Sequence, residues 1–408
     1  MLKRRHYQPC LEILEARDVP AFSIVQSGAV LTLNGSNNPN AVLIEDLGSN
    51  TIRITQDAVE SLYSNINRIN VNGRAGNDNV TYSVLSPSVK LWLDVRLGAG
   101  NDTFTGSVTL LPEDMVTAFN ASPRRLPADN VHRIDVDGGS GNDNITLAAE
   151  GLLPTGVSFQ GNFKGGSGAD NILTSFAGSN DGEVLVRIDG ESGNDNLAAI
   201  LGRSTGPAST NTGTIKIKVE GGTGKDVLNS WLGRSSDDEF APSEGIDNAG
   251  TIDLKLDGQH GDDEINYFLG TGPAFSSQVT NSGLLNVNIY GGSGDDNILA
   301  DVGDLSTTGL TYNFLNTGTA KINAYGESGK DNVTAIMWVE NSGTGSFRGA
   351  ISGGLNRDNL YYQLLLAGDN TAGAKGTLYA GPLDDLVQAS AIVQVLNAKK
   401  VTVIPDVI

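Results

Sequence analysis

The sequence has very little cysteine and histidine, two residue types on which many catalytic and metal sites depend. Its 408 residues include one cysteine, Cys10, and three histidines, His6, His132 and His260. A single cysteine excludes an intramolecular disulfide framework and a thiolate metal site. The chain also lacks a Gly-x-Ser-x-Gly elbow, a His-Glu-x-x-His helix and a phosphate-binding loop. We therefore predict a protein that is not an enzyme.

Long apolar runs and basic charge are scarce as well. No apolar stretch approaches the ~20 residues that a membrane helix needs, which predicts a chain without a membrane span. The chain has 27 Lys and Arg residues and 47 Asp and Glu residues, so its formal net charge is -20. A chain this acidic is repelled by nucleic acid and by anionic membrane surfaces. The excess of carboxylates suits either cation binding or simple solubility.

Glycine, in contrast, is abundant, with 52 residues, and much of it lies in a repeated phrase. The clearest copy, Ile134–Ile145, reads Ile-Asp-Val-Asp-Gly-Gly-Ser-Gly-Asn-Asp-Asn-Ile. Ten copies can be aligned on the Asp that ends the glycine turn, at intervals of 24 to 41 residues. These aspartates are Asp78, Asp102, Asp143, Asp170, Asp195, Asp226, Asp263, Asp296, Asp331 and Asp358.

The positions around the Asp are as regular as the Asp itself. A glycine stands two residues before it, except for Asn356, and another stands five residues before it, except for Leu97. An apolar residue always follows two places later, as Ile145 follows Asp143. Residues 35–42 fit the same frame with Asn40 in place of the Asp. We interpret them as a degenerate first copy, because end units of repeat arrays are often atypical.

The segments flanking each turn predict β-strands. Apolar Ile215, Ile217 and Val219 alternate with polar Lys216 and Lys218 before one turn, and this period of two indicates a half-buried strand. A unit of two such strands cannot bury its apolar face alone, but stacked units can. We therefore predict an all-β, right-handed parallel β-solenoid of about ten or eleven rungs, with one glycine-rich turn in each. A β-sandwich or antiparallel barrel is the rival fold.

The chain divides into four parts on this interpretation. Residues 1–22 form an export segment or an N-terminal cap, and residues 23–68 form strands that include the degenerate copy. Residues 69–376 form the repeat array, and residues 377–408 form a C-terminal cap. Residues 111–116 could begin a short helix, because Pro112 suits a first helical turn.

The repeated turn resembles a known family. Gly-Gly-x-Gly-x-Asp-x-apolar, as in Gly138–Ile145 and Gly291–Ile298, is similar to the calcium-binding signature of hemolysin-type, or repeats-in-toxin, proteins. The resemblance implies a parallel β-roll with Ca²⁺ held between stacked turns by the Asp carboxylates and turn carbonyls. It implies as calcium ligands Asp78, Asp102, Asp143, Asp170, Asp195, Asp226, Asp263, Asp296, Asp331 and Asp358. Oxygen-only ligation suits this hard cation.

One departure from that family matters. Family repeats follow one another every nine residues, whereas here each turn stands alone, so calcium requires that distant turns stack. The preceding residue varies too. Asp262 and Asp295 should favour a cation at Asp263 and Asp296, while Lys225, Lys330 and Arg357 should weaken the turns they precede. The alternative is a turn without metal. In it the Asp accepts a backbone N–H, and the asparagines that follow each Asp stack through hydrogen bonds between their side-chain amides.

The N-terminus carries a second resemblance. Residues 11–21, Leu-Glu-Ile-Leu-Glu-Ala-Arg-Asp-Val-Pro-Ala, are similar to an N-terminal segment of large secreted and surface proteins of planctomycete bacteria, which implies export. We therefore expect an extracellular or cell-surface protein that binds calcium and serves as a surface, adhesive or scaffold element, with cell-surface or matrix polysaccharide as a partner. The alternative is a carbohydrate-active β-helix protein, a lyase, epimerase or glycan binder. In that case a row of aromatic side chains would bind the sugar: Trp92, Trp231, Tyr267, Trp338, Tyr361 and Tyr362.

Overall fold

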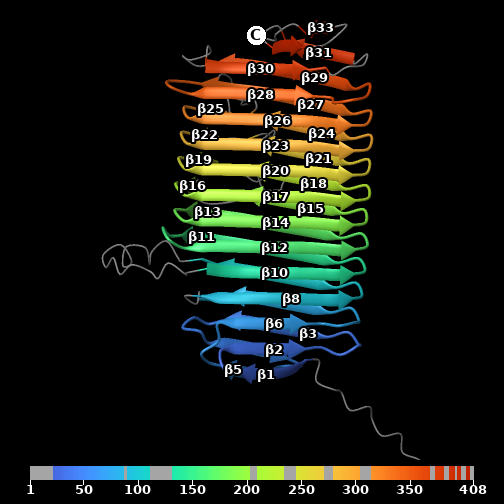
Figure 1. Ribbon diagram of the computed structural model, residues 1–408. Helices are drawn as coiled ribbons and strands as arrows, with labels where there is room; N and C mark the ends of the chain where they lie inside the picture. The colour runs from blue at the N-terminus through green and yellow to red at the C-terminus, as the bar shows by residue number, and fades with distance from the viewer. Residues whose placement is uncertain are drawn as a thin grey trace, which may run out of the picture.

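The computed structural model describes residues 22–86, 90–110, 131–202, 209–233, 245–270, 279–303, 314–367, 373–380, 386–390, 393–396 and 401–404. The elements within these ranges are β-strands. They stack along one axis as a parallel β-solenoid, as the sequence predicts (Figure 1). The predicted helix at residues 111–116 and residues 1–21, predicted as an export segment or N-terminal cap, lie outside the described residues. The described part contains no helix long and apolar enough to cross a membrane.

Sheet A forms one face of the solenoid and contains fourteen strands. In spatial order they are β1 (Ser23–Ser27), β2 (Val30–Asn34), β6 (Arg68–Asn72), β8 (Leu91–Ala99), β10 (Val131–Ser140), β12 (Ser158–Ser167), β14 (Glu183–Ser192), β17 (Thr214–Thr223), β20 (Thr251–His260), β23 (Leu284–Ser293), β26 (Thr319–Ser328), β28 (Ser346–Ser352), β30 (Ala374–Tyr379) and β32 (Val393–Leu396). All neighbours are parallel except β1 and β2.

Sheet B forms the opposite face. Its strands are β3 (Ala41–Asp46), β4 (Ile52–Gln56), β5 (Val59–Tyr63), β7 (Asn79–Val84), β9 (Thr103–Thr109), β11 (Asn144–Leu153), β13 (Asn171–Asn180), β15 (Asn196–Leu201), β16 (Ser209–Asn211), β18 (Val227–Leu232), β19 (Ile246–Asn248), β21 (Glu264–Leu269), β22 (Val279–Asn281), β24 (Asn297–Val302), β25 (Phe314–Asn316), β27 (Asn332–Asn341), β29 (Asn359–Ala367), β31 (Leu386–Ser390) and β33 (Val401–Ile404).

Each coil follows the same path. A sheet A strand such as β17 ends in the glycine turn, and the chain reverses direction into β18 of sheet B. It returns to sheet A through a loop of variable length and, in the middle rungs, a short second strand such as β19. Figure 1 shows the close-spaced turns along the side toward which the sheet A arrows point. The variable loops therefore leave the turns in register.

The core lies between the two sheets in columns of stacked apolar side chains. Strand pairing aligns Val136, Phe163, Ile188, Val219 and Leu256 on successive sheet A strands, and all are buried. The apolar residue that follows each turn Asp forms a matching column in sheet B. Its members include Ile145, Ile172, Leu197, Leu228, Ile265 and Ile298, each fully buried.

The ends of the array differ from its middle. At the N-terminal end β4 pairs with β3 and with β5 in antiparallel fashion, so the parallel ladder of sheet B ends in a short antiparallel segment. At the C-terminal end β30, β31, β32 and β33 continue the parallel coil. Part of the segment interpreted as a C-terminal cap therefore adds further rungs.

Candidate metal centre at the glycine corner

The glycine turn turns the Asp side chain into the body of the protein. In the turn after β10, Gly139 and Gly141 have φ of +99° and +130°, a region that side chains with a Cβ rarely enter. A Cβ on either would also overlap a carbonyl of the turn below, at Gly98 or Gly100. Glycine therefore suits both positions, although at the position of Gly139 other turns carry a non-glycine residue with positive φ, such as Glu191 and Gln259. Asp143 follows with only 2% of its surface exposed.

The ten turn aspartates stack in one row along the axis, which we call the aspartate file. Each Oδ1 accepts the backbone N–H of the equivalent residue in the preceding turn, at 2.7–2.9 Å; Asp102, for example, donates its N–H to Asp143. Asn40 opens the file by donating its N–H to Asp78. The prediction that distant turns stack in register is confirmed.

The second carboxylate oxygen, Oδ2, is in a different situation. In nine members of the file this atom is buried and has no hydrogen-bond partner among the described residues. These nine are Asp78, Asp102, Asp143, Asp170, Asp195, Asp226, Asp263, Asp296 and Asp331. Burying an acceptor without a partner costs about 1–3 kcal/mol. The file therefore holds many oxygens that would gain from a proton or a cation.

The glycine five residues before each Asp explains how Oδ2 is enclosed. A Cβ on Gly258 would overlap both Oδ2 of Asp263 and the carbonyl oxygen of Gly291 in the next turn. Gly138 shows the same pair of oxygens, from Asp143 and Gly165. A carboxylate oxygen and a backbone carbonyl thus face the same narrow space, and only a residue without a side chain leaves that space open. Where Leu97 replaces this glycine, its side chain is buried in the core.

Burial changes the acidity of the file. Loss of solvation raises the pKa of Asp78, Asp143, Asp195, Asp263 and Asp331 to about 7, and that of Asp296 to about 6. The backbone N–H that each Oδ1 accepts opposes this rise, and charges on neighbouring carboxylates add to it. The pKa values of Asp102, Asp170 and Asp226 are raised by burial as well. The carboxylates of the file therefore hold a proton more tightly than ordinary aspartates do.

The donor set fits a hard cation in kind. Carboxylate and carbonyl oxygens are the ligands that Ca²⁺ prefers, and it takes six to eight of them. Within the described ranges no three His, Cys, Asp or Glu side chains converge as a metal-binding group. A bound calcium would therefore take one Oδ2 per turn and complete its shell with glycine carbonyls and water.

The residue before each Asp lies outside the file and forms an exposed row. The N–H of Asp295 donates to Oδ1 of Asp262 at 2.8 Å, and the N–H of Lys330 donates to Oδ1 of Asp295 at 2.9 Å. The charges of Asp262 and Asp295 help to raise the pKa of Asp296, after burial itself. The expectation that Asp262 and Asp295 favour a cation at Asp263 and Asp296 stays a prediction.

The asparagines after the Asp stack partly as predicted. Asn171 donates an amide N–H to Asn144 at 2.9 Å, Asn196 to Asn171 at 3.1 Å, and Asn359 to Asn332 at 2.7 Å. These side chains are exposed. This ladder therefore coexists with the aspartate file and supplies a metal-free contribution to stacking.

A second ladder, which the sequence interpretation missed, lines the corner where sheet B returns to sheet A. Asn180, Asn211, Asn248, Asn281, Asn316 and Asn341 are buried, and each of the first five donates its Nδ2 to Oδ1 of the next at 2.7–2.8 Å. We call this the amide ladder. A recurring Asn-x-Gly, as in Asn211-Thr212-Gly213, was the available signal.

The other residues considered from sequence fall into two groups. Tyr267 and Tyr362 are fully buried core residues, so they cannot form a sugar-binding strip. Trp92 lies under the guanidinium groups of Arg68 and Arg133, 3.9 and 4.9 Å from the ring centroid. His260 is exposed in its turn, and His132 is half-buried. No family model, no curated protein and no solved structure matches this chain.

Proposed function

We propose that this chain is a non-catalytic, calcium-stiffened rod of an exported protein, serving as a surface, adhesive or scaffold element. The observation that carries the proposal is the row of nine buried Oδ2 atoms, from Asp78 to Asp331, that have no hydrogen-bond partner among the described residues. Eleven turn-bearing rungs at ~4.8 Å per strand give a rod about 50 Å long.

The contrast between the two corners supports a ligand at the aspartate file. The amide ladder uses Asn, whose Oδ1 accepts and whose Nδ2 donates, so both polar atoms of Asn211 and Asn248 are satisfied. Asn40, at the start of the file, likewise uses both atoms, accepting from the Ser36 N–H and donating to its hydroxyl. Stacking alone would be served at lower cost by Asn. Ten aspartates in its place point to a requirement for negative charge.

The proposed extracellular location favours calcium over protons as the ligand of the buried Oδ2 atoms. With pKa values about 7, protons would occupy only part of the file at neutral pH. Calcium sites of extracellular modules have affinities of about 0.1–1 mM, which fill outside a cell and stay empty inside it. Divalent charge would also offset the repulsion between stacked carboxylates, which is roughly 3 kcal/mol per pair at ~5 Å and an effective dielectric near 20.

A calcium titration of metal-stripped protein tests the proposal. We expect the melting temperature at pH 7.5 to rise with Ca²⁺ up to millimolar concentration, and native mass spectrometry to count the bound ions. A site filled at ten times its dissociation constant adds about 1.4 kcal/mol to the free energy of unfolding. An unchanged melting temperature with Ca²⁺ and with Mg²⁺ would remove the metal from the proposal.

A matched pair of variants locates the ion. Asp263→Asn removes a charge from the file, whereas Asp262→Asn removes the same charge from the exposed row one residue away. We expect Asp263→Asn to bind at least one ion fewer and to melt higher than wild type in EDTA, because Asn can donate where Oδ2 lacks a partner. Asp262→Asn should lower calcium affinity only slightly. Equal behaviour of the two variants would contradict binding within the file.

A further inference from the structure

The basic residues of the solenoid gather on one face. From β7 to β33 the sheet B strands contain no Lys or Arg, whereas the sheet A strands contain eleven. They are Arg68, Arg96, Arg133, Lys164, Arg187, Lys216, Lys218, Lys255, Lys321, Arg348 and Lys375. In a chain with a net charge of -20, this separation marks the outer face of sheet A as the place where an anion would bind.

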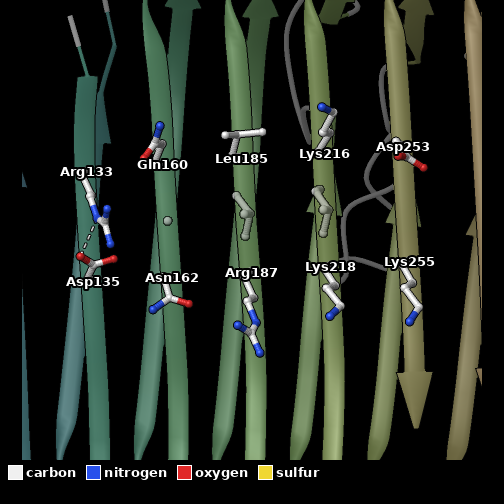
Figure 2. Close-up of a pocket in the computed structure, with 13 residues that line it drawn as sticks. Arg133, Asp135, Gln160, Asn162, Leu185, Arg187, Lys216, Lys218, Asp253 and Lys255 are labelled. Atoms are coloured by element: carbon white, nitrogen blue, oxygen red, sulfur yellow. Dashed lines mark hydrogen bonds and ion pairs between the residues drawn. The ribbon is translucent and has the colours of Figure 1, made fainter. Parts of the chain in front are cut away.

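Strand register arranges the central part of this face in two neighbouring columns, which we call the cationic columns. From β10 to β20 the first column contains Arg133, Gln160, Leu185, Lys216 and Asp253. The second contains Asp135, Asn162, Arg187, Lys218 and Lys255. Figure 2 shows these side chains in two rows across five strands. Five of the ten are cations and two are anions, so the patch is positive on an otherwise acidic protein.

The cationic columns border a shallow groove. It has a volume of about 590 Å³, and backbone and apolar residues such as Gly161, Val186 and Ile217 line it together with the charged side chains. The two columns lie about 7 Å apart, because residues two apart on a strand share a face, and successive rungs are ~4.8 Å apart. The groove is thus wide enough for one extended chain that runs along the solenoid axis.

The cations are held in position from one side. Arg187 pairs with Glu220 at 2.8 Å and with Asp189 at 2.9 Å, and Lys255 pairs with Asp257 at 2.7 Å. These carboxylates belong to a third column, which lies beside the second cationic column on the side opposite the first. A paired ammonium keeps two of its three donors for another acceptor. Among the described residues, Lys216 makes no ion pair and is exposed.

Polar and aromatic groups continue the same face beyond the groove. The cationic columns lead into Asn286 and Asn288 on β23, and Asn286 donates to Asp253 at 2.8 Å. The rings of Tyr290 and Tyr325 stack with centroids 5.3 Å apart in the third column. The ammonium of Lys255 lies 4.8 Å from the Tyr290 centroid. Amides and tyrosines beside cations are well suited to bind hydroxyl-rich rings that carry acidic groups.

We propose that the outer face of sheet A, centred on the cationic columns from β10 to β20, binds an extended acidic polysaccharide with carboxylates on successive sugars. One sugar ring is comparable in length to the step between rungs, so carboxylates of one chain meet Arg187, Lys218 and Lys255 on three consecutive strands. Nucleic acid fits less well, because its phosphates follow one another more closely than the rungs do, so the third-column carboxylates and the overall negative charge repel it more strongly than a chain with one carboxylate per sugar. This proposal does not depend on calcium in the aspartate file.

Calorimetric titration of the full chain with defined-length oligogalacturonates tests it. Fully methyl-esterified oligomers keep the sugar rings and remove the charge, so they serve as the ligand control. We expect the acidic oligomers to bind, more tightly as length increases and more weakly as salt increases, while the esterified oligomers do not. Titrations in EDTA and in Ca²⁺ should both show binding, which separates this result from the calcium proposal. Equal binding of esterified oligomers, or of single-stranded polynucleotide, would overturn the assignment.

Two charge-matched triple variants locate the site. Arg187→Gln, Lys218→Gln and Lys255→Gln together remove one Arg and two Lys from the cationic columns. Arg357→Gln, Lys225→Gln and Lys330→Gln remove the same charges from the exposed row at the glycine turns, away from the groove. We expect the first triple to lose at least about tenfold in affinity, or ~1.4 kcal/mol, and the second to lose much less. Equal losses, with both proteins folded by circular dichroism and melting temperature, would show that net charge alone is responsible.

Discussion

The choice between Asp and Asn decides the chemistry of each corner of the coil. Both side chains stack at the spacing of a parallel sheet and accept a hydrogen bond through Oδ1. Only Asn can also donate, so Asn248 satisfies both of its polar atoms while Asp263 leaves Oδ2 without a partner. The amide ladder is therefore a neutral, self-sufficient device. The aspartate file can carry negative charge, and its Oδ2 atoms gain a partner only from a proton or a cation.

This difference predicts how stability depends on pH in the absence of divalent cations. The pKa values of Asp143, Asp263 and Asp331 are about 7 in the folded protein and near 3.9 in an unfolded chain. The folded state therefore binds more protons between these values, and the free energy of unfolding falls as pH rises from about 4 to 7. Denaturant unfolding in EDTA across this range measures the slope. A stability that rises with pH would contradict the buried, unpaired file.

At the scale of the element, the glycine turn and the strands that flank it follow local rules. The glycine two residues before the Asp and the apolar alternation are both visible in the sequence, and the structure has them where the pattern indicates, for example at Gly141 and Ile145. The amide ladder was missed because its Asn-x-Gly corner is separated from the glycine turn by loops of variable length. Asn211, Asn248 and Asn281 align only when counted from the strand that follows.

Cutting the amide ladder should destabilise the solenoid more than removing an exposed asparagine. Asn248→Ala leaves Oδ1 of Asn281 without a partner in a buried setting and leaves Nδ2 of Asn211 with only the Thr251 carbonyl, which we expect to cost about 2–5 kcal/mol. Asn229→Ala, on the half-exposed outer face of β18, removes one hydrogen bond with Asn266 and should cost below about 1.5 kcal/mol. Chemical denaturation of both variants measures the difference, and equal costs would argue against the ladder as a source of stability.

At the scale of the whole molecule, each coil contacts only its neighbours. Stability in such arrays is approximately a sum of terms for each repeat and each interface, so the end coils, with one neighbour, are weaker than the middle. We expect backbone amides of β14, β17 and β20 to exchange with deuterium more slowly than those of β2 and β30. Hydrogen-exchange mass spectrometry tests this directly. Uniform exchange along the array would instead indicate a single cooperative unit.

The sequence by itself determined the repeat, the parallel solenoid and the alignment of the ten aspartates. These depend on local rules: glycine permits positive φ, and a period of two separates a buried face from an exposed one. Only the tertiary structure decided which atoms of those aspartates lack partners, that Asn180 to Asn341 stack at the opposite corner, and that Arg187, Lys218 and Lys255 lie side by side. Residues 31 to 37 positions apart become neighbours through strand register, and the intervening loops carry no signal of that register.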